Sequence, residues 1–272
     1  MKLLLDRLSS LPPASPSTRP ALMTHVVLGY PSLKESVELV KVMAENGADF
    51  VELQIPFSDP IADGPTIMAA SEAALSQGIT PTDCMRAMEQ LSKEVSVPLL
   101  FMTYCNLVFA YRNSEDSLDQ FCRDAANAGA QGLIVPDVPP EENTEGYWTK
   151  TLEYKLLPIP LVSPVSSEAR LKKISSCAKS GFVYCVSTTG TTGARNELPA
   201  ELTDYLSTVK EYFSIPRAVG FGISTGAHVE NLSGHAEIAI VGSAMLDRIS
   251  RAGENRRNAE VAAFTAELAG IA

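Results

Sequence analysis

One short segment of the sequence carries an acid and an amide at alternate positions of a predicted strand. In residues 50–55 every second residue from Val51 is apolar, so Glu52 and Gln54 share the opposite face, because side chains alternate across a strand. A carboxylate that faces a protein interior is costly unless it is paired or solvated. Burial also raises the pKa of a carboxyl group, which suits acid–base chemistry near neutral pH. The alternative is a surface strand with Glu52 in water.

The loop that follows this strand adds two aspartates. Residues 56–65 contain Asp59 and Asp63, and Asp63 stands directly before Gly64 and Pro65. Aspartate often forms turns through its side chain, and the composition around Asp63 is typical of a turn. Taken alone, the loop therefore predicts turn or capping roles for both aspartates.

Three glycine-rich segments follow later strands. Gly220–Ser224 and Gly242–Ser243 come after the predicted seventh and eighth strands, and the second of them opens a helix. Barrels often bind phosphate in these two loops, where backbone N–H groups and a helix N-terminus favour an anion. Simple turn glycines are the alternative. The third segment, Ser187–Arg195, has the composition of a mobile lid or of a solvated linker.

The whole chain alternates predicted strands with predicted helices, which favours a parallel sheet. Eight strands in 272 residues favour closure into an α/β fold of the (β/α)8 TIM barrel type, with an open doubly wound sheet as the alternative. No linker divides the chain, so we expect a single barrel domain over residues 1–272. The strands are expected at 25–29, 50–55, 99–104, 133–135, 159–162, 182–186, 217–220 and 238–241, and helices at 33–46, 66–77, 117–128, 141–155, 167–179, 200–212 and 255–268.

An extra N-terminal helix is expected ahead of the barrel. Within residues 1–11, Leu3, Leu4 and Leu8 suit one face of a short helix. The apolar run there is too short for a signal peptide, so we expect a cytoplasmic protein.

The charge balance excludes several classes of partner. The chain has 22 Lys and Arg residues against 32 Asp and Glu residues, a net charge of −10. Nucleic acid is bound mainly through clustered basic side chains, so neither nucleic acid nor an anionic membrane surface is an expected partner. No apolar run reaches the roughly 18 residues that a membrane span requires.

The cysteines and histidines carry no recognisable site. Five cysteines without a CxxC pair predict buried free thiols in a reducing compartment. The three histidines, His25, His228 and His235, lack the spacing of metal ligands, so no metal is expected and structural or surface roles are predicted for them.

The strand-two segment resembles the signature of the tryptophan synthase α subunit family. The resemblance covers Val51–Thr66 and continues in family order over nearly the whole chain. The segment around Glu52 is highly specific, whereas the glycine loops alone would not be. The further matching segments are Tyr104–Phe109, Val135–Pro139, Gly190–Gly193, Gly220–Ser224 and Val241–Ala244.

The resemblance implies a barrel that cleaves indole-3-glycerol phosphate to indole and glyceraldehyde 3-phosphate in tryptophan biosynthesis. This retro-aldol reaction belongs to a carbon–carbon lyase and needs no cofactor. Glu52 matches the family's catalytic glutamate, which shuttles protons. Asp63 matches the aspartate that accepts a hydrogen bond from the indole N–H, so the resemblance replaces the turn or capping role with a catalytic one.

The resemblance also implies substrate contacts and a protein partner. Indole would pass to a β subunit that uses pyridoxal phosphate, in an allosteric α2β2 heterotetramer. Asp59 and Pro60 would lie near that interface. The positions that match substrate contacts are Tyr184 and Phe221 for the indole pocket, Gly193, Gly222, Gly242 and Ser243 for the phosphate, and Thr192 for a lid that closes beside Asp63.

One position departs from the resemblance. Gln54 stands where family members carry glycine. Its side chain would project into the barrel beside Glu52, where it would hydrogen-bond that carboxylate or crowd the indole.

Two other functions compete with the lyase. One is a chiefly regulatory partner that activates a β subunit and turns over little alone. The other is a related indole-glycerol-phosphate synthase, whose chemistry would need a lysine on a strand near the substrate. No predicted strand core contains a lysine, which counts against the synthase.

Overall fold

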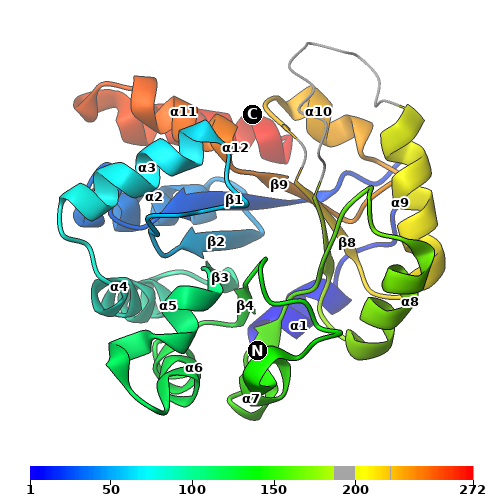
Figure 1. Cartoon of the computed structure of the whole chain (residues 1–272). Helices are drawn as coiled ribbons and strands as arrows, with labels where there is room; N and C mark the ends of the chain where they lie inside the picture. Colours follow the sequence, from blue (N-terminus) through cyan, green and yellow to red (C-terminus); the bar gives the residue numbers. More distant parts are fainter. Residues whose placement is uncertain (187–199, 221, 272) are drawn as a thin grey trace.

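The computed structural model describes residues 1–186, 200–220 and 222–271 (Figure 1). Within these residues, nine short strands form one parallel sheet in the order β5-β4-β3-β2-β1-β9-β8-β7-β6. The strands are β1 (Ala21–Val27), β2 (Phe50–Gln54), β3 (Leu99–Met102), β4 (Gly132–Ile134), β5 (Leu157–Pro158), β6 (Leu161–Val162), β7 (Val183–Val186), β8 (Arg217–Gly220) and β9 (Ile238–Val241).

The two end strands of the sheet are halves of one extended segment, which closes the barrel. Only Ile159 and Pro160 separate β5 from β6. The Ile159 N–H donates to the Leu133 carbonyl of β4 at 2.9 Å, and the Tyr184 N–H of β7 donates to the Pro160 carbonyl at 2.9 Å. The predicted barrel is therefore confirmed and the open sheet is wrong. The strand predicted over 159–162 is interrupted, because proline has no N–H to donate to the ladder.

Helices surround the sheet on its outer side (Figure 1). Most of the predicted helices are found within one or two residues of their expected bounds. The α-helices are α1 (Lys2–Ser9), α2 (Leu33–Glu45), α3 (Pro65–Ser76), α4 (Pro81–Glu94), α5 (Cys105–Phe109), α6 (Ser117–Asn127), α7 (Tyr147–Glu153), α8 (Glu168–Cys177), α9 (Ala200–Tyr212), α10 (Gly226–Asn231), α11 (Ser243–Arg251) and α12 (Arg257–Ala269). Three short 3-10 helices are η1 (Tyr111–Asn113), η2 (Thr144–Gly146) and η3 (Glu254–Arg256).

Several helices differ from the sequence-based expectation. The helix expected over 141–155 is reduced to η2 and α7, because Asn143, Glu145 and Gly146 all have positive φ and cannot continue an α-helix.

Helices α4, α5 and α10 were not expected. Helix α4 begins with a capping box in which the Thr80 and Asp83 side chains each accept from the other's backbone N–H.

The cysteine prediction is only partly confirmed. Cys84, Cys122 and Cys185 are buried free thiols, whereas Cys105 is half-buried and Cys177 is exposed. Cys177 is the last residue of α8, on the outer layer of helices.

Apolar side chains form two clusters, one between the sheet and the helices and one inside the barrel. On β2, Val51 and Leu53 belong to the outer cluster and Phe50 to the inner cluster. Glu52 is 2% exposed and Gln54 is fully buried. The predicted alternation of β2 is therefore confirmed, and the surface-strand alternative for Glu52 is wrong.

Helix α1 closes the amino-terminal end of the barrel. Leu4 and Leu8 belong to the cluster inside the barrel, and the N-terminal amine donates to the Gln131 side chain just before β4, at 2.7 Å. Leu3 is 42% exposed, so its predicted place on the buried face is wrong. Leu4 and Leu8 are four residues apart and therefore share one face, whereas Leu3 is rotated away from the barrel.

Truncating the buried leucine of α1 should destabilise the protein. We expect Leu4→Ala to lower the free energy of unfolding by roughly 2–5 kcal/mol, because it removes buried contacts and leaves a cavity. Leu3→Ala is the matched control and should stay within about 0.5 kcal/mol of the parent. Urea unfolding followed by circular dichroism measures both. Equal losses in the two variants would show that α1 does not seal the barrel.

Candidate active site

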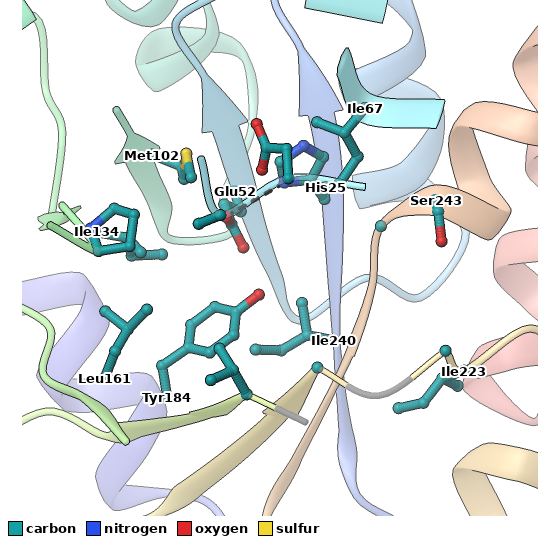
Figure 2. Close-up of a pocket in the computed structure, with 17 residues that line it drawn as sticks. His25, Glu52, Ile67, Met102, Ile134, Leu161, Tyr184, Ile223, Ile240 and Ser243 are labelled. Carbon is teal, nitrogen blue, oxygen red and sulfur yellow. Dashed lines mark ion pairs between the residues drawn. The ribbon is translucent and has the colours of Figure 1, made fainter. Parts of the chain in front are cut away.

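One pocket opens at the carboxyl ends of the barrel strands (Figure 2). This is the end where chemistry occurs in barrels of this type. Strands β1, β2, β7 and β9 and the segments that follow them supply its polar lining. It brings together six of the residues predicted from the sequence, which are Glu52, Asp63, Tyr184, Gly222, Gly242 and Ser243.

The remaining predicted site residues are not in this pocket. Thr192, Gly193 and Phe221 lie outside the described residues. Asp59 is exposed and Pro60 is buried in the loop between β2 and α3, and neither lines the pocket.

Glu52 is paired with a histidine from the neighbouring strand. The parallel register of β1 and β2 places His25 directly opposite Glu52. Nδ1 of His25 lies 3.2 Å from Oε1 of Glu52, and both side chains are buried at 5% and 3% exposure (Figure 2). This ion pair offsets part of the cost of burying the carboxylate.

His25 was not among the site residues predicted from the sequence. A surface role is wrong, because His25 is buried and lines the pocket. The strand predicted over 25–29 begins earlier, at Ala21, which puts Met23 and His25 on the inward face. With these bounds, the same alternation that was applied to β2 would have placed His25 inside the barrel.

The charges around His25 favour its protonated form. Burial by itself would lower the pKa of His25. The opposing effects are larger in sum, because the charge and hydrogen bond of the Glu52 carboxylate, the charge of the Asp63 carboxylate and the polar side chain of Gln54 all raise it. The net result is a pKa of His25 above its ordinary value.

Asp63 is held beside this pair by a hydrogen bond from β2. Nε2 of Gln54 donates to Oδ2 of Asp63 at 2.6 Å. Burial raises the pKa of Asp63, against the opposing effects of Gln54, His25 and Tyr104. The Asp63 N–H closes a turn onto the Pro60 carbonyl at 3.0 Å, so the predicted turn is present in the backbone.

The Asp63 side chain does not cap the following helix. The N-cap of α3 is Gly64, and no side chain caps it. The acid is therefore free to face the pocket.

Tyr184 packs over a glycine at the far side of the pocket. A Cβ on Gly220 would lie 3.1 Å from the Tyr184 ring, so a side chain at this position would force the ring to shift by a few tenths of an ångström. Burial, together with the charges of Glu52 and Asp63, raises the pKa of the Tyr184 hydroxyl well above its usual value. Tyr184 is therefore a neutral wall of the pocket.

Backbone groups of the segments that follow β8 and β9 also line the pocket. Gly222 has a φ of +53°, in the left-handed region that favours glycine. Gly242 is the N-cap of the nine-residue helix α11, whose first N–H groups have no partner within the helix. Neither lysine nor arginine occurs among the described residues that line the pocket. The lysine-dependent synthase is therefore disfavoured, and an anion bound here would rely on backbone donors.

Comparison with known proteins identifies the family. The family model described as "Tryptophan synthase alpha chain" matches residues 13–270. A relative of that name from Desulfotalea psychrophila is 41% identical over 222 residues, which is 82% of this chain and 85% of that protein. The chain belongs to the tryptophan synthase alpha chain family. Its members are lyases that cleave indole-3-glycerol phosphate, so the predicted family, fold and activity are confirmed.

Solved structures agree with this family assignment. Tryptophan synthase from Mycobacterium tuberculosis aligns with a TM-score of 0.81 and 34% identity, over 93% of this chain and 92% of that chain. The tryptophan synthase subunit alpha from Legionella pneumophila aligns with a TM-score of 0.84 and 30% identity, over 99% and 97% of the two chains. The barrel is therefore shared over nearly its whole length.

Gln54, the departure from the tryptophan synthase alpha chain pattern, is placed differently from both expectations. Its amide donates to Asp63 and not to Glu52, with a longer contact of 3.5 Å to Oγ of Ser71. It is fully buried and does not line the pocket.

The stability of the fold should depend on pH through His25. The folded protein binds the His25 proton more tightly than the unfolded chain, whose histidine pKa is about 6.5. The stabilisation is complete below that pH and is lost as pH rises through the higher folded pKa. We therefore expect the stability advantage of the parent over His25→Phe to shrink as the pH rises above about 6.5. The loss should be about 1.4 kcal/mol for each pH unit that separates the folded pKa of His25 from the unfolded one.

Urea unfolding at a series of pH values measures this difference. Thr24→Val, which changes a buried residue on the same strand without removing a titratable group, is the control and should show no such trend. An advantage that is constant or grows with pH would show that His25 is not protonated against Glu52.

Proposed function

We propose that Glu52 and Asp63 carry the lyase reaction of this chain, with Glu52 as the proton-transferring group. The observation that supports this is their convergence in one pocket that is also lined by Gly222, Gly242 and Ser243. A substrate with an aromatic ring at one end and a phosphate at the other fits this combination of groups. We propose that the whole site belongs to one barrel domain over residues 1–272.

The reaction needs two proton movements that balance. A proton is added at C3 of the indole ring, and the hydroxyl on the attached glycerol carbon loses its proton. The bond between that carbon and C3 then breaks, which leaves indole and an aldehyde, glyceraldehyde 3-phosphate. Glu52 is the acid or base for these transfers, because it is inside the pocket and its charge is balanced by His25 at 3.2 Å.

Asp63 accepts the indole N–H. Protonation at C3 gives the ring positive charge, which strengthens an N–H donor. A carboxylate at this position therefore stabilises the transition state more than the bound substrate. Gln54 holds the acid in place by the hydrogen bond to Oδ2.

The rest of the pocket binds the two ends of the substrate. Gly222, Gly242 and Ser243, with Gly193, form the phosphate cradle, since free N–H groups at a helix N-terminus attract anions. Tyr184 and Phe221 form walls for the indole, and Thr192 belongs to a lid that closes beside Asp63. No metal or other cofactor takes part.

Replacing the proton-transferring acid should abolish indole release. We expect Glu52→Gln to lower kcat by about 10²–10⁴-fold, the range that acid–base catalysis supplies. Glu45→Gln makes the same chemical change on the exposed face of α2 and should keep full activity. Indole released from indole-3-glycerol phosphate is measured directly. A folded Glu52→Gln variant with near-parental activity would disprove the assignment.

We propose that a β subunit is the partner of this chain, in an α2β2 heterotetramer in the cytoplasm, with pyridoxal phosphate only in the β subunit. The name of the family supports a multi-subunit synthase. Asp59 is exposed and Ile61 is 82% exposed in the same loop, which supports a docking surface near Asp59 and Pro60. In the described residues no helix has both the length and the apolar character to cross a membrane.

Adding a β subunit should raise the rate of indole formation. The loop that carries Asp59 also carries Asp63, so a partner that fixes this loop would hold the acid in place and speed the reaction. Titrating β subunit into the pure chain and measuring indole tests this, with Asp59→Lys expected to shift the titration to higher β concentrations. No partner effect would indicate a stand-alone indole producer, whereas negligible activity of the chain alone would indicate a chiefly regulatory partner.

A further inference from the structure

Two further polar side chains, His25 and Gln54, each contact one of the two acids. His25 on β1 contacts Glu52 at 3.2 Å, and Gln54 on β2 contacts Asp63 at 2.6 Å. His25 is 4% exposed and Gln54 is fully buried. Each acid therefore has its own polar support, and both supports come from adjacent strands in register.

His25 and Gln54 each have one buried polar atom without a hydrogen-bond partner. Nε2 of His25 and Oε1 of Gln54 are both shielded from water, and neither has a hydrogen-bond partner among the described residues. His25 and Gln54 stand on adjacent strands, and the register sets His25 opposite Glu52, two residues before Gln54, so the two side chains are diagonal neighbours on one face of the sheet. One is a donor and the other an acceptor, which makes them complementary.

Only one orientation of the Gln54 amide satisfies both neighbours. A protonated imidazole has two N–H donors and no acceptor, so it needs the amide oxygen of Gln54. An ionised Asp63 only accepts, so it needs the amide nitrogen. The orientation found in the structure, with Nε2 toward Asp63, meets both demands.

We propose that His25 and Gln54 are positioning residues that join the two acids into one chain, Glu52–His25–Gln54–Asp63. The missing link is a hydrogen bond from Nε2 of His25 to Oε1 of Gln54, which a small shift of either side chain completes when substrate binds. The proposal rests on the proposed roles of Glu52 and Asp63 and deepens them. It gives Gln54, the departure from the family pattern, the role of orienting Asp63 and His25 in this site.

The linked side chains couple the charge of Glu52 to the charge of Asp63. The ionisable groups that face this array are Glu52 and Asp63 on either side of His25, and Tyr184 across the pocket. As the indole ring becomes cationic, Asp63 is drawn toward it and the amide follows, which polarises the bond to His25. His25 in turn keeps Glu52 oriented for proton transfer. Loss of either the His25 or the Gln54 side chain should therefore lower kcat for the same reason.

A double-mutant cycle tests whether His25 and Gln54 act as linked residues. The variants are His25→Phe, Gln54→Met and the double variant, with kcat and KM for indole release and urea unfolding measured for each. If the chain is continuous, each single change lowers kcat about tenfold with a smaller change in KM, and the double variant loses about tenfold and not about a hundredfold, since linked residues are not additive.

Two controls separate positioning from general damage. His25→Gln keeps a hydrogen-bonding side chain without the charge, so it should regain part of the kcat lost in His25→Phe, whereas a merely structural role of His25 would give recovered stability without recovered kcat. Thr24→Val removes another buried, unpartnered polar atom on β1, next to His25 but on the opposite face of the strand, and should keep parental activity.

Each outcome decides the proposal. Losses in kcat that multiply in the double variant, or a Gln54→Met variant with parental kcat, would overturn it even though the lyase function stands. If the parent protein itself releases no indole with β subunit present, the proposed catalytic roles fail. The unfolding free energies of the single and double variants then decide whether His25 and Gln54 are linked: non-additive changes support the link and additive changes overturn it. Gln54→Leu replaces Gln54→Met if the latter does not fold.

Discussion

The site depends on the register between β1 and β2, which sets His25 against Glu52. A carboxylate at 2% exposure needs a partner of opposite charge, and this pairing supplies one from the adjacent strand. A slip of one residue would place Thr24 or Val26 opposite Glu52 and turn the histidine toward the helices. The whole arrangement of the polar side chains in the pocket follows from this one alignment.

The inner face of β2 is apolar where the strand begins and polar where it ends. Phe50 lies in the apolar cluster near α1, Glu52 lines the pocket, and Gln54 supports Asp63 behind it. The apolar end is closed by Leu4 and Leu8, so the polar end has a rigid floor. This layering places Glu52 on a strand near its carboxyl end, with Asp63 and the substrate-contacting glycines on the loops that follow the strands, as the fold favours.

An acidic chain can hold a phosphorylated substrate when the binding groups are backbone amides. The net charge of −10 would repel an anion, and the described pocket has no basic side chain apart from His25. Unpaired N–H groups at the start of α11 supply a local positive potential.

Much of the site was predictable because it depends on local periodicity. The alternation around Glu52, the glycines after β8 and β9, and the order of the motifs can all be read along the chain, and they led to the barrel and the family. The tertiary structure alone decided that His25 faces Glu52 and that Gln54 binds Asp63. The reason is physical: alternation determines which face a side chain occupies, but its partner is chosen by inter-strand register and loop packing, which bring together residues far apart in sequence.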